Sequence, residues 1–444
     1  MSAGLAGRIF PAHAYSDAPI KGCFWAETVP DSELERPPLE GRARADVAIV
    51  GAGFTGLNAA LALAQAGVSV TVLDARFPGW GASGRNGGFC CLGGAKASDT
   101  MLDRAHGRPA RLAYRRAERD AVAHVSDLLE THDIDALTHS EGETVLAHKR
   151  SIRFEEAARE VEENYGVSPT IHSTADLPGL GMVGAFYGGM TTPVGFGLHP
   201  RAYLAGLLAA AEAAGVQVFG DSPVTGQDHT ARHCLTTPRG HLEADTLLIA
   251  TNGYSSDALP PWLAGRYMPA QSSVIVTRPL SEAELANGWN SAQMAFDSRT
   301  LLHYFRLMPD RRFLFGMRGG LGASPRSETR VSCKIRADFE RMFPFWSHVE
   351  TPQYWSGMVC LSGALTPFCG PVPGEKNTYA ALAYHGNGVA MGSYAGALVA
   401  DQILGQRALE LPQVMQTPPR RFPLGRFRRA LMLPLYAGAW LRDL

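Results

Sequence analysis

Three closely spaced glycines form the motif Gly51-Ala52-Gly53-Phe54-Thr55-Gly56 between an apolar stretch and an alanine- and leucine-rich stretch. Glycine at these points permits a tight turn, lets backbone N–H groups approach a pyrophosphate and allows close packing of a following helix. The positive end of that helix favours an anion. Asp74 follows the next apolar stretch. Its spacing from the glycine motif is about that at which a carboxylate accepts hydrogen bonds from the ribose hydroxyls of a dinucleotide. With Ala75 and Arg76 beside Asp74, the pattern predicts a bound dinucleotide; a glycine-rich turn in an unrelated sheet is the alternative.

A second glycine-rich loop, Gly79 to Gly88, indicates which dinucleotide this is. Its polar side chains can place hydrogen-bond donors around a second stretch of phosphate and ribityl chain, which FAD presents. A flexible surface linker is the alternative, but Arg and Asn interrupt what would otherwise be a Gly/Ser tether. The predicted cofactor contacts from this loop are Ala82, Ser83, Arg85, Asn86 and Gly87.

A third glycine-containing element, Tyr384 to Val389, also precedes a helix-like stretch. Its unpaired N–H groups would suit the carbonyl oxygens and developing negative charge of a reduced isoalloxazine, with simple sheet-to-helix packing as the alternative. No second GxGxxG motif occurs, which argues against a separate NAD(P)H domain. The predicted cofactor contacts here are Gly386, Asn387, Gly388 and Val389, joined by Val224 and Thr251 from the middle of the chain.

The elements that must position these motifs predict an α/β fold. A strand at 47–50, a helix at 54–66 and a strand at 69–73 form a β-α-β unit. Later stretches return the chain to a parallel sheet, namely a helix at 201–214 and strands at 216–219 and 244–250. Shorter strand-like pieces predict a second, antiparallel sheet, at 272–277, 301–307 and 312–317. Surface helices are expected at 100–130 and 154–165.

The length of 444 residues favours two domains. We predict a Rossmann-like FAD-binding domain and a second α+β substrate domain built on a mostly antiparallel sheet. The predicted boundaries are an N-terminal arm at 1–45, a discontinuous FAD-binding domain at 46–100, 165–265 and 355–410, a substrate domain at 101–164 and 266–354, and a basic and apolar tail at 411–444.

Composition excludes several classes of protein. A hydrophobic content of 45% is typical of globular proteins, and a net charge of -1 provides no field that would attract nucleic acid. The seven cysteines are scattered without metal-type spacing and indicate reduced thiols, so we expect no metal site. Neither a secretory signal nor an apolar run of roughly 20 residues is found, so we expect a cytoplasmic protein without a transmembrane segment. The sequence contains no indication of the oligomeric state.

Taken together, the motif at 51–56, the loop GWGASGRNGG and the late element HGNGVAMG resemble the D-amino-acid oxidase superfamily of FAD enzymes. Within it, the similarity is greatest to the γ-glutamylputrescine oxidase group. It extends over nearly the whole chain from about Phe24, through the segments 198–211, 250–260, 304–318 and 354–374. One departure concerns Thr366-Pro367-Phe368-Cys369, where family members usually read Thr-x-Asp. The change would remove a carboxylate from the region expected to face the flavin.

The resemblance implies oxidation of the carbon–nitrogen bond of a small amine or amino-acid-like substrate, similar to γ-glutamylputrescine. Hydride would pass to flavin N5, water would hydrolyse the imine, and oxygen would be reduced to hydrogen peroxide. Two alternatives stay open. One is a dehydrogenase that passes electrons to a membrane quinone, with the basic tail 418–444 as its docking surface. The other is a flavin-bearing protein that has lost its activity.

Tyr304, Arg306 and His385 are the candidate catalytic residues. On a strand, Tyr304 and Arg306 project to the same face, and Arg306 could pair with a substrate carboxylate, unless it lies on a solvated face. His385 could contact the flavin ring or simply fill space. Sarcosine-type relatives link their flavin to a cysteine in the region of Cys360 and Cys369. Because small buried cysteines are commoner, we predict non-covalent FAD.

Overall fold

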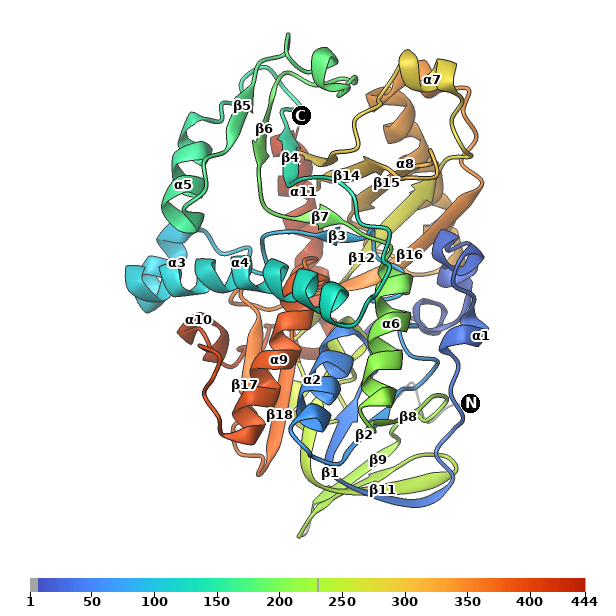
Figure 1. Ribbon diagram of the computed structural model, residues 1–444, viewed down its shortest axis with the longest axis vertical. Coiled ribbons are helices and arrows are strands. Elements are labelled where there is room, and N and C mark those ends of the chain that lie inside the picture. The colour runs from blue at the N-terminus through green and yellow to red at the C-terminus, as the bar shows by residue number, and fades with distance from the viewer. Residues whose placement is uncertain (1–6, 230, 444) are drawn as a thin grey trace.

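Two large β-sheets organise the computed structural model, which describes residues 7–229 and 231–443 (Figure 1). The first sheet has the strand order β17-β18-β11-β1-β2-β8, and the neighbours from β18 to β8 are parallel. A hairpin of β9 and β10 extends from the edge of β11. The strand bounds are β1 Gly41–Val50, β2 Val70–Leu73, β8 Gln217–Phe219, β9 Gly226–His229, β10 His233–Thr236, β11 Gly240–Ile249, β17 Phe368–Pro371 and β18 Thr378–Leu382.

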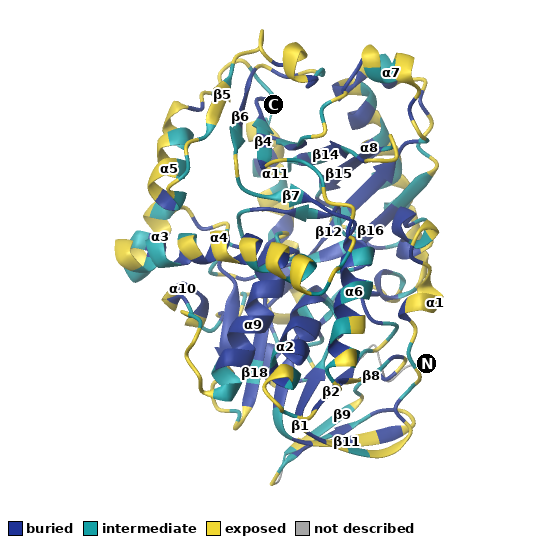
Figure 2. Ribbon diagram, viewed as in Figure 1, coloured by how far each residue is buried: buried dark blue, intermediate teal, exposed yellow. Residues whose placement is uncertain are grey.

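Four helices pack together over one face of this sheet (Figure 1). They are α2 Phe54–Gln65, α4 Arg108–Thr131, α6 Pro200–Ala213 and α9 Ala390–Leu404. Helices α2 and α9 are buried over most of their length (Figure 2). Their close approach requires a small residue, since a Cβ on Gly396 would lie 2.4 Å from the carbonyl oxygen of Thr55. This packing fixes the start of α2 against the sheet.

The second sheet has the order β16-β12-β15-β14-β13-β4-β6-β5 and is antiparallel except for the pairing of β13 with β4. Helix α8, Pro325–Met342, packs against it over a core rich in phenylalanine and tryptophan, with Trp289, Phe305 and Phe313 among its fully buried members. The strand bounds are β4 Glu143–Leu146, β5 Thr170–His172, β6 Gly189–Thr192, β12 Met268–Val276, β13 Met294–Asp297, β14 His303–Leu307, β15 Phe313–Arg318 and β16 Gln353–Leu361.

Short elements connect and cover the two sheets. The remaining α-helices are α1 Asp31–Leu34, α3 Asp99–His106, α5 Glu155–Tyr165, α7 Glu282–Ala286, α10 Gln413–Gln416 and α11 Met432–Asp443. A two-stranded ribbon pairs β3 Phe89–Cys90 with β7 Phe196–Gly197. The 3-10 helices are η2 Ala12–Tyr15, η3 Ala18–Ile20, η4 Phe24–Glu27, η5 Pro178–Leu180, η6 Asn252–Tyr254, η7 Pro261–Leu263, η8 Pro344–Trp346 and η9 Gly425–Leu431. No helix of the described residues combines the length and apolarity needed to cross a bilayer.

The predicted α/β fold with a mostly antiparallel second sheet is confirmed, but several bounds differ. Strand β1 begins at Gly41, inside the predicted irregular arm, because its first residues pair with β11 from Gly240 onward. The expected helix at 100–130 is two helices, since Gly107 adopts a φ of +83° and Pro109 lies in the first turn of α4.

Sheet pairing also changes how the segments are grouped. Strands β5 and β6 lie within the range 165–265, and β16 lies largely within 355–410, yet all three belong to the second sheet. Strand β16 pairs with β12 along its whole length, which places it with the antiparallel strands. We therefore propose domain boundaries in which 170–192 and 353–361 belong to the substrate domain.

Candidate cofactor and substrate pocket

A cavity of about 570 Å³ lies at the carboxyl ends of the parallel strands of the first sheet. Val50, Leu73 and Ile249, at the ends of β1, β2 and β11, line one side of it, and Ser272 and Tyr304 of the second sheet line the other. Ligands of open parallel sheets bind at this edge, outside the carboxyl ends of the strands. Both sheets therefore contribute to one pocket.

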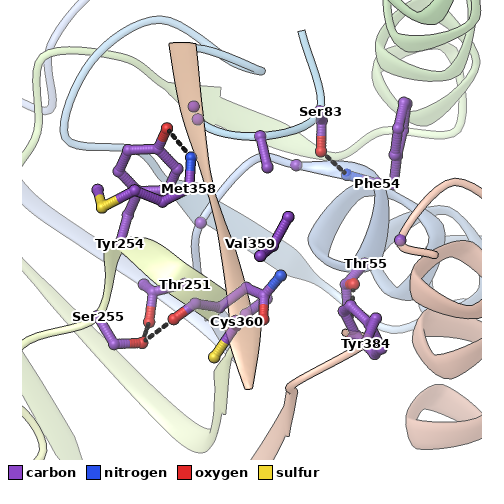
Figure 3. Close-up of a pocket in the computed structure, with 18 of the residues that line it drawn as sticks. Phe54, Thr55, Ser83, Thr251, Tyr254, Ser255, Met358, Val359, Cys360 and Tyr384 are labelled. Carbon is purple, nitrogen blue, oxygen red and sulfur yellow. Dashed lines mark hydrogen bonds between the residues drawn. The ribbon is translucent and has the colours of Figure 1, made fainter. Parts of the chain in front are cut away.

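The glycine motif at 51–56 forms the turn between β1 and α2. Gly51 has a φ of +108°, and a Cβ on Gly56 would lie 1.9 Å from the carbonyl oxygen of Gly51, so a larger residue would push the helix away from the strand. The N–H of Phe54 donates to Ser83 Oγ over 3.0 Å (Figure 3). Within the described residues, no hydrogen bond uses the N–H of Gly53 or Thr55, so both are available to an anion at the start of α2. The turn fits the diphosphate of a dinucleotide.

Asp74 directly follows β2 at the same edge of the sheet. Its carboxylate accepts hydrogen bonds from the N–H groups of Ala52 (2.8 Å) and Arg76 (3.0 Å), and burial raises its pKa to about 6. Ala75 also lines the pocket, but Arg76 does not. The Arg76 side chain instead approaches Asp17 of the N-terminal arm at 3.5 Å, so its backbone, not its guanidinium, supports the site.

The loop 79–88 wraps the pocket, but two of its predicted donor side chains hold the loop itself. The Arg85 guanidinium donates to the carbonyl oxygens of Trp80, Gly81 and Ser356, which ties the loop to β16. The Asn86 amide donates to Ser83 O over 2.8 Å. Both residues line the cavity, but their side-chain donors are used within the loop and on β16. They therefore contribute to the site mainly by fixing the path of the loop backbone around the cavity.

The third element, between β18 and α9, brings the C-terminal part of the chain to the same pocket. The Tyr384 hydroxyl lies 2.9 Å from the Thr55 hydroxyl, which joins this element to the start of α2 (Figure 3). The Asn387 amide donates to Leu92 O over 2.8 Å and anchors the turn on the loop after residue 88. His385 points away: its Nδ1 donates to Gly94 O (2.8 Å) and its Nε2 accepts from the N–H of Ser362 (3.2 Å). Burial lowers the pKa of His385 to about 4, so it is a neutral structural residue.

Most of the residues predicted from the sequence line this one cavity. They are Gly51, Gly53, Phe54, Thr55, Asp74, Ala75, Ala82, Ser83, Arg85, Asn86, Gly87, Val224, Thr251, Tyr304, Gly386, Asn387, Gly388 and Val389. Four predicted residues lie outside its lining, namely Gly56, Arg76, Arg306 and His385. Gly56 acts through packing, as its spacing predicts.

Arg306 is buried, and its predicted contact with a substrate carboxylate is not supported. Its guanidinium donates to Leu198 O over 2.7 Å and lies 3.1 Å from His139 Nε2. Trp25 of the N-terminal arm and Phe89 of β3 lie beside it, so the face that Arg306 shares with Tyr304 is covered at this point. The alternation of side chains along a strand predicts that Arg306 and Tyr304 share a face, but it does not predict that Trp25 and Phe89 cover that face at Arg306.

Four charged residues of the pocket are not indicated by the sequence motifs: Arg8 of the N-terminal arm, and Lys96, Glu143 and Arg318. Arg318 ends β15, Glu143 begins β4, and Lys96 follows the glycine-rich loop. Burial raises the pKa of Glu143 to about 7, while the charge of the nearby Arg318 lowers the pKa of Lys96 to about 8. Within the described residues, neither the Lys96 nor the Arg318 side chain forms a hydrogen bond or an ion pair. These four residues are far apart in the sequence and belong to no motif, so their position in the pocket cannot be predicted from the spacing of residues.

The cysteines considered for flavin attachment have different surroundings. Cys360 lines the pocket, and burial raises its pKa to about 12, which keeps its thiol protonated. Cys369 and Phe368 lie in β17, outside the pocket lining, and Phe368 packs on Trp262 with ring centroids 5.5 Å apart. The departure at 366–369 therefore lies at the edge of the first sheet, and the lining of the pocket gives no support to the expectation that it faces the flavin.

Comparison with known proteins gives a consistent result. A sequence model of the family described as "FAD dependent oxidoreductase" matches residues 46–402. A protein of Rhizobium meliloti named "Probable oxidoreductase OrdL" is 32% identical over 431 residues, covering 95% of this chain and 97% of that protein. The Gamma-glutamylputrescine oxidoreductase of Escherichia coli is 29% identical over 400 residues, covering 90% of this chain and 92% of its own.

Solved structures share the fold. Glycine oxidase from Geobacillus kaustophilus superposes with a TM-score of 0.66 at 22% identity, covering 84% of this chain and 99% of that one. An L-amino acid deaminase from Proteus vulgaris, lacking its specific insertion sequence, superposes with a TM-score of 0.68 at 16% identity, covering 92% and 99%.

Proposed function

Because this chain belongs to the family of FAD-dependent oxidoreductases, which act on the carbon–nitrogen bonds of amines or amino acids, we propose that it is an amine oxidase whose substrate also carries a carboxylate. γ-Glutamylputrescine, named for the Escherichia coli relative, has both groups and is our reference compound. Oxygen is the proposed electron acceptor, with hydrogen peroxide as the product.

One observation carries this proposal: away from Arg8 and the cofactor-binding motifs, the pocket contains one acid, Glu143, and two cations, Lys96 and Arg318, and neither cation has a hydrogen-bonded partner among the described residues. Arg318 and Lys96 offer cations to a carboxylate, and Glu143 offers an anion to an ammonium group. Lys96 is exposed and Glu143 and Arg318 are half-buried, but a substrate that fills the pocket would cover all three. A covered charge without a partner is costly, so a substrate that supplies both opposite charges would be stabilised there. A simple monoamine would leave the two cations unpaired.

The residues of the chain would orient the substrate and manage its proton. FAD supplies the hydride acceptor. Glu143, with its pKa near 7, would take the proton of the incoming ammonium so that the amine reacts in its neutral form. Tyr304, whose hydroxyl lies 3.0 Å from Ser272 Oγ, would shape the wall opposite the glycine loop and exclude water.

The proposal is tested by mixing the FAD-loaded protein with substrates in the absence of oxygen and following flavin absorbance. The panel contains γ-glutamylputrescine, putrescine, glycine, sarcosine and proline. Rapid bleaching by compounds with both an amine and a carboxylate, and slow bleaching by putrescine, would support the proposal. Bleaching by putrescine at the same rate as by γ-glutamylputrescine would contradict the role of the carboxylate, and no bleaching by any compound would contradict oxidase activity altogether.

A dehydrogenase that reduces a membrane quinone is the second candidate, and the C-terminal segment favours it. Leu433, Leu435, Trp440 and Leu441 of α11 are 56–65% exposed. Exposed arginines, including Arg426, lie just before this helix. Apolar side chains beside cations suit an anionic membrane surface. Oxygen uptake at turnover favours the oxidase; turnover that needs an added quinone, together with sedimentation with anionic vesicles, favours the dehydrogenase.

A further inference from the structure

The N-terminal arm places a cation in the cofactor pocket. Arg8 lines the cavity and lies close enough to Asp74 for their charges to interact. Because Asp74 accepts a hydrogen bond from the N–H of Ala52, Arg8 lies near the glycine turn that fits a diphosphate. The matched family region begins at residue 46, so Arg8 lies outside it. Neither the glycine motifs nor the comparisons assign a role to this residue.

The position of Arg8 is fixed by its neighbours. Its guanidinium carbon lies 4.4 Å from the centre of the Tyr15 ring, and the Tyr15 hydroxyl accepts a hydrogen bond from the N–H of Phe10. Gly7, with a φ of +73°, accepts a hydrogen bond at its carbonyl oxygen from the N–H of Asp257 over 2.9 Å. A Cβ on Gly7 would lie 2.7 Å from Ala258 N, so the arm fits closely against this loop.

The guanidinium of Arg8 lacks a protein acceptor. Its Nε is buried without a hydrogen-bond partner, and no ion pair engages it among the described residues. Burial lowers its pKa, and Arg8 is close enough to Asp74 for each charge to influence the other. Asp74 already accepts two backbone hydrogen bonds. Arg8 is half-buried, and its buried Nε is a donor that only an acceptor from elsewhere can satisfy.

The diphosphate of FAD can supply the hydrogen-bond acceptor and the negative charge that Arg8 lacks. It is anionic and presents several acceptor oxygens, which a planar guanidinium binds well. The start of α2 contributes only partial positive charge from its N–H groups. Arg85, another cation of the lining, already donates hydrogen bonds to the carbonyl oxygens of Trp80 and Ser356. We propose that Arg8 binds the diphosphate of FAD, which makes the N-terminal arm a part of the cofactor site.

Ligand binding to the apoprotein tests this proposal independently of turnover. FAD binding is followed by the change in flavin fluorescence, with ADP, adenosine and riboflavin as competitors. For Arg8→Met, we expect the dissociation constants of FAD and ADP to rise by about 10- to 100-fold, the usual range for a lost charge-assisted hydrogen bond. The constants for adenosine and riboflavin, which have no phosphate, should not change. For Arg8→Lys, the dissociation constants of FAD and ADP should lie between those of the wild type and Arg8→Met, because lysine keeps the positive charge but lacks the planar set of donors of a guanidinium group.

Arg429 provides a matched control. Its guanidinium carbon lies 3.8 Å from the centre of the Phe10 ring, so it also holds the arm, but it does not line the pocket. Arg429→Met should leave the FAD dissociation constant within a factor of two or so of the wild type, as expected for a residue distant from the ligand. Equal losses in the Arg8 and Arg429 variants would overturn the proposal in favour of simple arm docking. So would an unchanged constant in Arg8→Met, or an equal loss of adenosine binding.

Discussion

Glu143 and Lys96 have shifted pKa values that lie close together, at about 7 and about 8. The two shifts have opposite directions: burial raises the pKa of Glu143 to about 7, whereas the nearby Arg318 lowers that of Lys96 to about 8. Glu143 is therefore largely ionised above about pH 7, and Lys96 is largely protonated below about pH 8. Both carry charge together in a narrow interval, which is where the proposed substrate would bind best.

Replacement of Glu143 by glutamine should abolish the acidic limb of the pH profile. The variant keeps the size of the side chain but cannot take the proton of the substrate ammonium, so flavin reduction should slow by about 10²-fold or more at pH 8. The measurement is the rate of anaerobic flavin bleaching by γ-glutamylputrescine between pH 6 and pH 9. Lys96→Met should instead change the alkaline limb. A Glu143→Gln profile that still falls toward acid would contradict the assignment.

Arg318 and Arg306 offer a matched pair of substitutions in the second sheet. Arg318→Met should raise KM for a carboxylate-bearing amine by about 10- to 100-fold, because a charge-assisted hydrogen bond to the substrate is lost. Arg306→Met removes a buried guanidinium that donates to Leu198 O, so it should lower the melting temperature and leave KM nearly unchanged. The pair is compared by steady-state kinetics and thermal unfolding. The reverse pattern would restore the sequence-based assignment of Arg306.

The contrast between these residues shows what spacing can reveal. Asp74 was predicted because one β-α-β unit fixes its distance from the glycine motif. Arg306 was placed on the correct face of its strand, but Trp25, far away in the sequence, covers it. Lys96 and Glu143 approach each other only after the second sheet has formed, and no local pattern indicates that proximity.

At the scale of elements, the crossing of β1 and α2 depends on the absence of a side chain at Gly56. A methyl group there would lie 1.9 Å from the carbonyl oxygen of Gly51, and backbone cannot yield as a side chain would. We expect Gly56→Ala to cost about 1 to 3 kcal/mol in unfolding free energy and to weaken FAD binding, as measured by urea unfolding and flavin titration. Gly179→Ala, which has open space around its Cβ, is the control and should change neither quantity.

A buried ion cluster joins β13, β14 and α8 of the second sheet. His303 Nδ1 lies 2.8 Å from Asp297, and its Nε2 lies 3.0 Å from Asp338; all three side chains are at most 4% exposed. Although burial opposes the charge, hydrogen bonds to the two carboxylates raise the pKa of His303 above its ordinary value. The charged imidazole thus connects two strands with the helix that covers them.

This cluster predicts a pH-dependent stability of the second sheet. The folded protein holds the His303 proton more tightly than the unfolded chain, whose value is near 6.5. The stabilisation is therefore complete below about pH 6.5 and disappears as the pH rises through the folded-state pKa. His303→Gln should lose about 3 to 5 kcal/mol at pH 6, and less at pH 9, as followed by urea unfolding. A loss that is equal at both pH values would contradict a charged His303.

The elements were easier to predict than their grouping. Periodicity indicates α2 and β2 almost to the residue, because the local pattern of apolar residues distinguishes a helix from a buried strand whatever its partners are. The membership of β16 could not be predicted, since its partner β12 lies about 80 residues earlier and other strands would satisfy the same alternation.

At the scale of the whole molecule, one cavity is lined by both sheets, so FAD should stabilise them together. A ligand that binds the folded state alone adds about 2.7 kcal/mol when present at 100 times its dissociation constant. Calorimetry of the apoprotein with increasing FAD should show the melting temperature rising and any separate transitions merging into one. If only one of two transitions moves, the ligand contacts a single domain, contrary to the lining of the pocket.

The pocket also joins segments far apart in the sequence, since Arg8 and Val389 both line it. During synthesis, the N-terminal part of the chain leaves the ribosome first. The edge of β11 at Leu247–Ile249 stays unpaired until its partner in β18, Thr378–Ala380, has been synthesised. Until then, the growing chain carries an unpaired strand edge and an incomplete cradle that cannot retain FAD. We therefore expect cofactor capture to follow the synthesis of β18 and of the turn after it, and nascent chains of this protein should depend on chaperones for longer than their first β-α-β unit alone would suggest.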